Sequence, residues 1–430
     1  MEKSLDRKLA AIHADPSGSK EFILADAKDA DMAFGIGSPG LSPEMHAGEV
    51  RMRTLTEYRD YIRQITQQGL IDIMLMSASS NDVLAIGEGL FDNSHVTPAA
   101  RANDTSDIFV VRHGRYITTP SRPFRSASLD HIQCGHVDCE PHERTRGANL
   151  GLYSVTFNNR LEDDLVSLEE YRRFREEAER KGFRHFLEVF DPNNPQGLTG
   201  ETTPQFINDS IARTLAGVAE AGRPVFLKIV YHGPKAMEEL VSYDPHLVVG
   251  ILGGGAGTTY DAFKLIAEAQ KYGARAALFG RKINNAECQL AFVELLRRIV
   301  DGQVSPEEAV RAYHGVLGRL KIKPKKSLAD DLQLESGVMS YGNTSSVSVP
   351  ALKLAGGSPS SSPKSKSDGH HDCGCGGSER KACHCHDQQP GVESTTTGPT
   401  NGELSLADFA RMTQAEKLAY NKAKRDRIFG

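Results

Sequence analysis

Eight short apolar runs, most of them followed by a helical stretch, constrain the fold of this chain more than any other feature. The runs lie at 22–25, 71–76, 108–111, 152–157, 185–190, 225–231, 247–252 and 276–279. Stretches with helical character lie between them, among others at 165–180, 205–221, 260–272 and 287–300. Strands that alternate with helices pair in parallel through right-handed crossovers. Eight such units predict a closed (β/α)8 barrel, and a doubly wound open sheet is the alternative.

The third unit departs from this alternation. Residues 112–146, which follow the third run, are rich in His, Arg, Pro and Cys and lack helical periodicity. We therefore predict that this segment is a long insertion lying over the mouth of the barrel.

The composition of the chain divides it into three regions. We expect the barrel to occupy 1–335. Residues 336–403 are rich in Ser, Gly, Pro and Lys and contain a Cys/His cluster at 370–386. Such a segment cannot bury enough apolar surface to offset the entropy of ordering it, so we predict a disordered linker. Helical character returns at 404–430, where Thr413 and Glu416 have the spacing of a capping box.

Charge and hydropathy exclude several classes of function. The 430 residues carry a formal net charge of -5, so no overall basic field points to nucleic acid or to an anionic membrane. No window approaches the run of about 18 apolar residues that a membrane span needs, and the first residues lack the apolar core of a secretory signal. The seven cysteines are an odd number, which argues against a disulfide framework. We expect a cytoplasmic protein.

Two charged residues interrupt the apolar runs expected to be the fifth and sixth strands. These residues are Glu188 and Lys228, and reactive side chains of such barrels lie at the carboxyl ends of the strands. A buried amine is suited to form a Schiff base with a carbonyl, and a carboxylate nearby to transfer protons. The alternatives are a structural ion pair for Glu188 and, for Lys228, a strand-edge lysine that extends its amine into solvent.

Further polar residues follow the sixth and the first runs. Tyr231 and His232, at the end of the sixth, are candidates for proton transfer. Asp26, Lys28 and Asp31 belong to a group of charges that ends the first run, where neighbouring charges shift one another's pKa values. An ordinary solvated loop is the alternative for this group.

Glycine-rich turns follow the seventh and eighth runs. Glycines let backbone N–H groups approach an anion, a helix N-terminus favours negative charge, and an arginine can clamp it. The loops after strands seven and eight are the usual phosphate site of such barrels. A turn with a purely structural role is the alternative. The predicted phosphate-binding residues are Gly253, Gly254, Gly255, Gly280 and Arg281.

With these segments in hand, the chain resembles a known family over about residues 20–320. The sequence KIVYHG at 228–233 is similar to the imine-forming segment of archaeal-type fructose-bisphosphate aldolases. The sequence FLEV at 186–189 is similar to the preceding strand of tagatose-bisphosphate aldolases. The glycine turns resemble the phosphate loops of the same enzymes. The family is that of the class I (Schiff-base) aldolases.

This resemblance implies an aldehyde-lyase of carbohydrate metabolism that breaks or forms a C–C bond in a phosphorylated sugar or a related keto or aldehyde compound. Lys228 would form the imine, and Glu188 or Tyr231 would move a proton. Asp26 occupies the place of the family's first-strand aspartate and would position hydroxyl groups, with Lys28 beside it. The imine chemistry of this family requires no cofactor.

The turn after the first strand supports a rival hypothesis. Asp26, Lys28 and Asp31 fit the D-x-K-x-x-D signature of the orotidine-phosphate decarboxylase and hexulose-phosphate synthase group. That resemblance implies a phosphosugar lyase or decarboxylase, in some cases with Mg²⁺. A third hypothesis is a non-catalytic sugar-phosphate-binding scaffold, which would need the phosphate loops but not Lys228.

The last hundred residues suggest further partners. The Cys and His side chains of this region are soft ligands that suit Zn²⁺, Ni²⁺ or Cu(I). The alternative is a low-complexity tail with incidental affinity for metals. A short helix on a linker is how enzymes are targeted into bacterial microcompartments, so 404–430 is a candidate shell-binding segment. Docking of that helix on its own barrel or dimer is the alternative, and we expect a homo-oligomer. The candidate metal ligands are Cys373, Cys375, Cys383, His384, Cys385 and His386.

Overall fold

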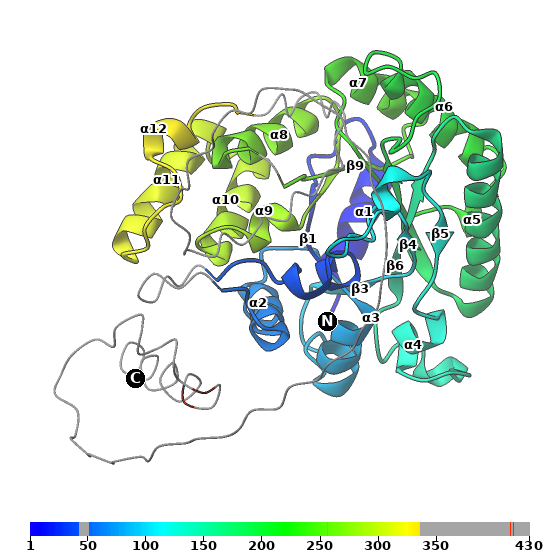
Figure 1. Cartoon of the computed structure of the whole chain (residues 1–430), viewed down its shortest axis with the longest axis horizontal. Helices are drawn as coiled ribbons and strands as arrows, with labels where there is room; N and C mark the ends of the chain where they lie inside the picture. Colours follow the sequence, from blue (N-terminus) through cyan, green and yellow to red (C-terminus); the bar gives the residue numbers. More distant parts are fainter. Residues whose placement is uncertain (43–50, 256, 336–412, 414–415, 417–430) are drawn as a thin grey trace, which may run out of the picture. The chain divides into compact units, whose positions relative to one another are not determined.

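The computed structural model describes residues 1–42, 51–255 and 257–335, together with 413 and 416. Within these residues, parallel strands close into a barrel in the order β1-β10-β9-β8-β7-β6-β3-β2, with helices around it (Figure 1). This closure confirms the predicted (β/α)8 barrel and excludes the open sheet. The barrel strands are β1 (Ile23–Lys28), β2 (Ile73–Met76), β3 (Thr97–Arg101), β6 (Leu150–Thr156), β7 (Arg184–Phe190), β8 (Leu227–Ile229), β9 (Val249–Leu252) and β10 (Ala276–Phe279).

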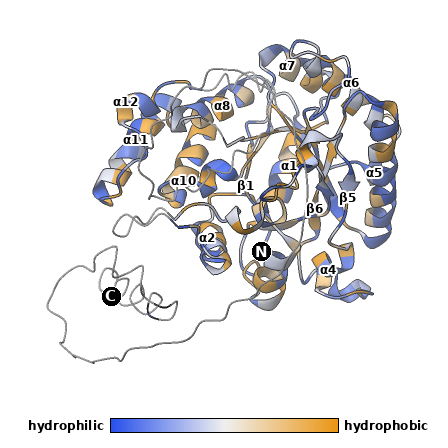
Figure 2. Cartoon of the chain, viewed as in Figure 1, coloured by the Kyte–Doolittle hydropathy of each residue, from blue (hydrophilic) through white to orange (hydrophobic). Residues whose placement is uncertain are grey.

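The helices of the outer layer begin at residues that cap them. At α2 and α11, for example, the hydroxyl of the capping residue accepts a hydrogen bond from the backbone N–H of a Glu three residues on. The carboxylate of that Glu accepts one from the backbone N–H of the capping residue. Both hydrophilic and hydrophobic residues occur along outer helices such as α5 and α10 (Figure 2), as expected where one face packs on the barrel. The α-helices are α1 (Ser4–Ala14), α2 (Leu55–Gln68), α3 (Ala78–Asn81), α4 (Leu129–Cys134), α5 (Leu161–Lys181), α6 (Thr203–Leu215), α7 (Pro234–Tyr243), α8 (Thr259–Lys271), α9 (Arg281–Asn284), α10 (Gln289–Val300), α11 (Pro306–Arg319) and α12 (Leu328–Asp331). Shorter helical segments are η1 (Ala30–Met32), η2 (Gly35–Gly37), η3 (Asp82–Gly87), η4 (Tyr116–Thr118), η5 (Pro141–Glu143) and η6 (Glu220–Gly222).

The third strand of the barrel is not the predicted one. The run at 108–111 lies outside the barrel, where Phe109 makes ring contacts with Tyr116 and Phe124. The strand is instead β3, with the sequence TPAAR. Proline and alanine are depleted in strands, so propensity does not signal this segment. Its two alanines are fully buried, which shows that the close packing around β3 is made by small side chains.

The predicted insertion has two parts. In the first, a two-stranded sheet of β4 (Asp104–Thr105) and β5 (Pro123–Phe124) forms beyond β3. The Asn193 side chain, which follows β7, donates to Ile117 O and Thr119 O at 3.2 and 2.8 Å. This part therefore lies at the mouth, as predicted. The second part, with α4, leads back to the amino end of β6, so the insertion does not cover the mouth along its whole length.

Alternate side chains of each barrel strand face the interior or the helix layer. The helix-side residues form one apolar cluster with the outer helices. The interior residues form a second, separate cluster, which also contains three residues of α1. On the strands, this interior cluster consists of Ile23, Ala25, Ala27, Ile73, Leu75, Ala99, Leu150, Leu152, Phe186, Phe226, Val248, Ala276 and Leu278.

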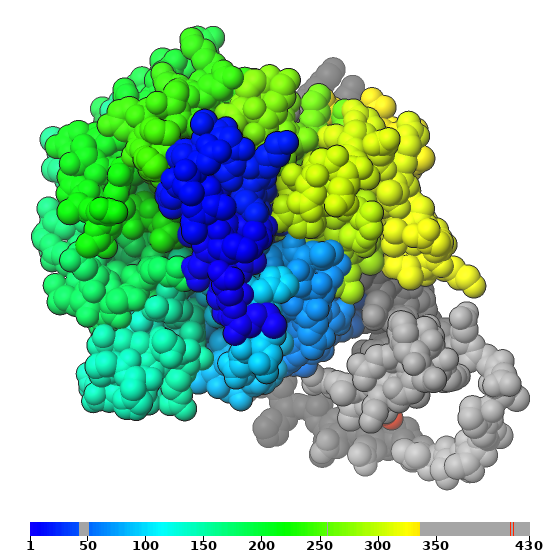
Figure 3. Space-filling model, turned by 180° about the vertical axis from the view of Figure 1, so that it is seen from behind, coloured from blue at the N-terminus to red at the C-terminus, as the bar shows by residue number. Residues whose placement is uncertain are grey.

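Helix α1 closes the amino end of the barrel. Leu5, Leu9 and Ile12 recur at helical spacing on one face of α1, are buried, and pack into the interior cluster. Figure 3 shows this N-terminal segment in dark blue, lying across the middle of the face seen from behind. Among the described residues, the interior of the barrel is thus covered by α1 at the amino ends of the strands.

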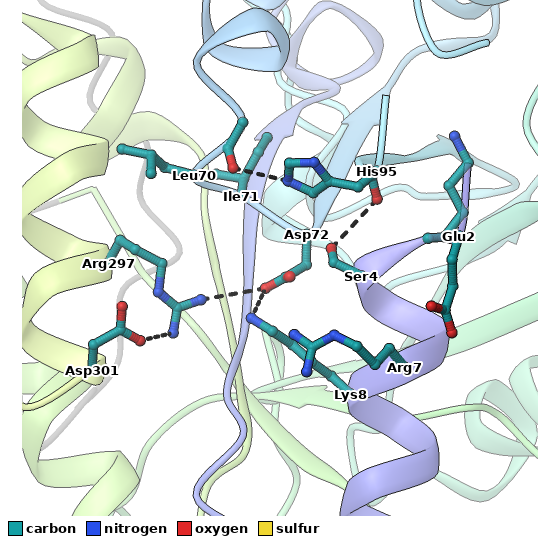
Figure 4. Close-up of a pocket in the computed structure, with 12 residues that line it drawn as sticks. Glu2, Ser4, Arg7, Lys8, Leu70, Ile71, Asp72, His95, Arg297 and Asp301 are labelled. Atoms are coloured by element: carbon teal, nitrogen blue, oxygen red, sulfur yellow. Dashed lines mark hydrogen bonds and ion pairs between the residues drawn. The ribbon is translucent and has the colours of Figure 1, made fainter. Parts of the chain in front are cut away.

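A buried ionic network fastens α1 to the barrel. Lys8 Nζ lies 2.8 Å from the Asp72 carboxylate and donates to Phe22 O at 2.8 Å. Arg297 of α10 contacts Asp72 at 3.5 Å and Asp301 at 2.8 Å. Figure 4 shows these side chains converging at the edge of a cavity of about 390 Å³. Because Asp72 directly precedes β2, this cavity lies at the amino end, away from the catalytic face expected of such barrels.

The last quarter of the chain falls mostly outside the described residues, including the predicted linker at 336–403 and its metal ligands at 370–386. Of the predicted helical segment at 404–430, the described contacts are those of Thr413 with Glu416. Thr413 N donates to the Glu416 carboxylate at 2.7 Å, and Glu416 N to the Thr413 hydroxyl at 3.4 Å. Among the helices that could be described, none has both the length and the apolar character needed to cross a bilayer.

The ionic network predicts a large difference between two neighbouring residues of α1. Lys8→Ala should lower the free energy of unfolding by about 3 kcal/mol, because it removes the closest cation from the buried Asp72 carboxylate. Arg7→Ala is the matched control, since the partly exposed Arg7–Glu21 pair contributes about 0–1 kcal/mol. Urea unfolding of the two variants measures the difference. Equal losses in both would show that the network does not fasten α1.

Candidate active site

Two sequence-predicted residues meet inside the barrel. Glu188 on β7 is directly opposite Lys228 on β8 in the strand register, and Lys228 Nζ lies 2.6 Å from Glu188 Oε1. The rings of Phe186 and Phe226, two residues earlier on each strand, are stacked with centroids 4.6 Å apart. The ion pair therefore faces the interior, with an apolar floor on its amino-terminal side. Lys228 is 6% exposed, which rules out the strand-edge lysine with a solvated amine.

Arg101, which the sequence did not single out, connects this pair to the first strand. Its guanidinium lies 2.7 Å from Asp29 Oδ2 and 3.6 Å from Glu188 Oε2, and donates to Ser154 Oγ at 3.2 Å. Ser154 Oγ in turn donates to Glu188 Oε2 at 2.7 Å. Cations and carboxylates thus alternate from Asp29 to Lys228, and all of these side chains are buried. The network fixes the Glu188 carboxylate in one orientation.

The two candidates that follow Lys228 lie on different sides of the strand. His232 Nε2 is 2.8 Å from Asp191 Oδ1, and both residues follow the carboxyl ends of their strands. Tyr231 faces the helix layer, where its hydroxyl donates to Glu268 of α8 at 3.4 Å. The structure therefore does not bring Tyr231 to the Lys228 amine, because residues an odd number of positions apart on a strand face opposite sides. His232 is the better placed group for proton transfer.

Asp26 and Lys28 are also not brought to Lys228. They alternate with Ala25 and Ala27 of the interior cluster, so they face the helix layer. Their side chains form an ion pair of 3.0 Å that has no solvent exposure. Burial raises the pKa of Asp26 and lowers the pKa of Lys28. A pair enclosed in this way has no open path to a substrate.

Burial raises the pKa values of two aspartates near the mouth, Asp31 and Asp104. Ser77 Oγ donates to Asp31 Oδ2 at 2.5 Å, but burial outweighs this bond and raises the pKa of Asp31 to about 6. Burial also raises the pKa of Asp104 to about 6, against the opposing effect of Arg101. Groups with such pKa values are often functional, since they bind or release protons near neutral pH.

The predicted phosphate loops lie beside each other. Gly253 directly follows β9 and packs closely against β10. A Cβ atom at this position would lie 2.2 Å from the Phe279 ring. A Cβ atom on Gly255 would lie 3.0 Å from Arg281 Nε, so the Arg281 side chain lies against the glycine turn. Gly254 has φ +58°, which favours glycine. The structure thus brings the predicted Gly253, Gly254, Gly255, Gly280 and Arg281 together at the carboxyl ends of β9 and β10.

Lys282, which sequence reasoning missed, is a half-buried amine beside these loops. Its Nζ donates to Gly257 O at 2.5 Å. Burial lowers its pKa to about 8, although Asp261 and Asp331 act in the opposite direction. The signal that could have found it is its position directly after Arg281 at the start of α9. A cation here adds to the positive potential at the candidate phosphate site.

Asp31 generates a prediction about stability and pH. In the folded protein the pKa of Asp31, about 6, is above the ordinary value near 3.9. The free energy of unfolding therefore falls as the pH rises from about 4 to 6. Above pH 6 the folded protein carries the full cost of burying the ionised carboxylate. Asp31→Asn should therefore raise the free energy of unfolding at pH 8 by at most about 3 kcal/mol, and not at pH 4. Thermal unfolding at both pH values tests this. Asp60→Asn, on the half-exposed carboxylate, is the control, and an Asp31→Asn effect independent of pH would contradict the assignment.

Comparison with solved structures supports the fold. A fructose-bisphosphate aldolase from Slackia heliotrinireducens matches with a TM-score of 0.50 and 13% identity, over 72% of this chain and 91% of that one. An archaeal fructose 1,6-bisphosphate aldolase matches at TM-score 0.48 and 15% identity, over 69% and 99%. An archaeal aldolase whose catalytic Lys is bound to a carbinolamine intermediate gives TM-score 0.48 and 15% identity, over 68% and 99%. No protein-family model and no curated protein matches. The chain therefore has the barrel fold found in class I fructose-bisphosphate aldolases.

Proposed function

We propose that this protein is a class I aldolase-like lyase that breaks or forms a C–C bond through a Schiff base on Lys228. The observation that carries the proposal is the buried contact of 2.6 Å between Lys228 Nζ and Glu188 Oε1. An amine and a carboxylate in contact inside a barrel mouth are the two groups that imine formation needs, a nucleophile and a partner that exchanges its protons.

The proposed reaction begins with Glu188, which accepts a proton from the Lys228 ammonium. The free amine attacks the substrate carbonyl to give a carbinolamine, and Glu188 returns the proton as water leaves. The iminium then accepts the electron pair of the breaking C–C bond, while a hydroxyl proton leaves to a base at the mouth. His232, oriented by Asp191 at 2.8 Å, is the group proposed for that step. The imine step uses no cofactor.

The substrate proposed for this site carries a phosphate. Backbone N–H groups of the turn after β9, together with Arg281 and the half-buried Lys282 amine, supply positive potential on one side of the mouth. Binding of a remote phosphate there would orient the reacting carbonyl toward Lys228. This combination favours a phosphorylated keto or aldehyde compound.

The D-x-K-x-x-D hypothesis is not favoured by the position of its residues. Asp26 and Lys28 face the helix layer as a fully buried pair, whereas Asp31 lies with Ser77. The hydrogen bonds of Asp31 and of the Asp26–Lys28 pair thus go to different partners, so a joint action of the three residues on one substrate, with or without Mg²⁺, is the less favoured proposal. The non-catalytic scaffold remains an outcome of the experiment below.

Several expectations from the sequence stay predictions. They are the accessory metal binding of the tail, the homo-oligomer, the cytoplasmic location and the microcompartment shell as a partner of 404–430. None of them enters the proposed chemistry.

Borohydride reduction tests the Schiff base. In the presence of dihydroxyacetone phosphate or a phosphorylated ketose, peptide mass spectrometry should find the reduced adduct on Lys228. Lys228→Met should abolish the adduct and lower kcat/KM by at least about 10³-fold. Glu188→Gln should lower kcat by about 10²–10⁴-fold, the range for a positioned proton-transfer group.

Lys282→Met is the matched control for this experiment, because it removes another amine near the mouth and leaves Lys228 in place. It should weaken binding of the phosphorylated substrate but retain the adduct on Lys228 at saturating substrate. An adduct on Lys282 or Lys28 in the native protein would keep the imine chemistry but refute Lys228 as its site. Substrate binding without any adduct would refute the lyase and leave the sugar-phosphate-binding scaffold.

Arg281 provides a separate test of the phosphate site. Arg281→Ala should raise KM for a phosphorylated substrate by at least about 10-fold, since a charge-assisted hydrogen bond contributes roughly 1.5–3 kcal/mol. The effect should be small for the same compound without its phosphate. Steady-state kinetics on the two compounds measure this difference, and equal losses on both would show that Arg281 does not bind the phosphate.

A further inference from the structure

A group of metal-ligating side chains lies outside the candidate active site, on the connection between α4 and β6. Ligand atoms of Cys134, Cys139 and Glu143 all lie within 4.8 Å of one another. Both cysteines are buried and free, and the Glu143 side chain is only 16% exposed. The Cys134 thiol donates to His136 O at 3.5 Å and the Cys139 thiol to Glu140 O at 3.8 Å, long contacts that leave both sulfurs close to the Glu143 carboxylate.

Local structure holds these three residues in place. Cys134 is the last residue of α4, which ends at Gly135 with φ +88°. Cys139 follows Asp138, a residue with φ +56°, and Glu143 ends η5. A capping box between Glu140 and Glu143 fixes that short helix. The two thiols are separated by four residues, which is within the range of cysteine spacings in zinc sites.

His136 is suited to complete the set. Its Nδ1 is 2.8 Å from Val137 O, and a carbonyl oxygen only accepts, so Nδ1 carries a proton. Its Nε2 donates to Glu143 Oε1 at 3.3 Å, and a bound cation would take the place of that Nε2 proton. A backbone carbonyl that accepts from the non-ligating nitrogen is the usual second partner of metal-bound histidines. The ring of His136 is half-exposed and contacts Glu143, one of the three residues of the group.

We propose that Cys134, Cys139, Glu143 and His136 form a structural site for Zn²⁺ or a similar thiophilic divalent cation. Two thiolates, an imidazole and a carboxylate are ligands that zinc takes in four-coordinate sites. The cation would lie between the two sulfurs and the Glu143 carboxylate. Arg146, 3.0 Å from Glu143, would contact the carboxylate from outside.

The position of the site indicates its role. Gly147 N donates to Gln133 O of α4 and so closes the segment on itself, and Ala148 N donates to Asn81 Oδ1 of α3, the helix that follows β2. The segment then enters β6, the strand that carries Ser154. A metal would cross-link this connection at the amino end of β6 and so stabilise the strand on which Glu188 depends.

The test must separate this site from the cysteines and histidines of the tail. We would use the full chain in which Cys373, Cys375, Cys383 and Cys385 are changed to Ser and His384 and His386 to Ala, here called the tail variant. It should bind one Zn²⁺ per chain against a competing chelator, and Co²⁺ should give thiolate charge-transfer absorption. Zn²⁺ should also raise its Tm.

Adding Cys134→Ser and Cys139→Ser to the tail variant should weaken Zn²⁺ binding at least about 100-fold and remove the thiolate absorption. Cys288→Ser is the matched control, since Cys288 is a free cysteine outside the group, and it should change neither. If the double substitution prevents folding, Glu143→Gln and His136→Ala, which keep both thiols, should each weaken binding at least about 10-fold.

Two results would overturn the proposal. The first is a tail variant that retains no zinc and shows no thiolate absorption with Co²⁺. The second is a Cys134–Cys139 disulfide as the predominant form in protein alkylated at lysis, which would make the two cysteines a redox pair. Either result would leave the proposed lyase chemistry unaffected, because Lys228 and Glu188 share no ligand with this group.

Discussion

The charged interior of this barrel depends on Arg101. A carboxylate buried in a protein interior needs a cation and hydrogen bonds to offset the loss of its hydration. Arg101 supplies both to Asp29 at 2.7 Å. For Glu188 it supplies the charge at 3.6 Å and holds Ser154, which donates the hydrogen bond. Lys228 closes the series on the far side of Glu188. Without the guanidinium, Asp29 would lose this ion pair and Glu188 would lose part of its fixed orientation.

The alternation of side chains along a strand decides which charges reach this network. Glu188 and Lys228 lie opposite each other and face inward, in step with Phe186 and Phe226 of the interior cluster. Asp26 and Lys28, equally charged and equally well placed in the sequence, face the helices instead. One position along a strand moves a side chain to the other face. A motif can therefore match a family by spacing and still be directed away from the site.

The same reasoning explains how far the sequence could predict this protein. Apolar runs and helical periodicity predict the barrel, and the isolated charges within two runs identify Lys228 and Glu188. Arg101 could not be found in this way, because β3 reads TPAAR and lacks the β-branched residues that mark a strand. The facing of Tyr231 and Asp26 also could not be assigned, since it depends on the register and the strand start, which periodicity fixes only to within a few residues. His232 was identified, but its Asp191 partner comes from another strand.

The two ends of the barrel have opposite physical characters, and this difference supports the direction of substrate entry. At the amino end, α1 covers the apolar interior, and Lys8, Asp72 and Arg297 satisfy one another. A ligand there would have to displace a formed network or a packed helix. At the carboxyl end, burial holds Asp31 and Asp104 at a free-energy cost that the fold itself does not require. Proteins tolerate such a cost mainly where a function uses the group. A substrate is therefore expected to enter at the carboxyl ends of the strands, where Asp31 and Asp104 are buried at this cost.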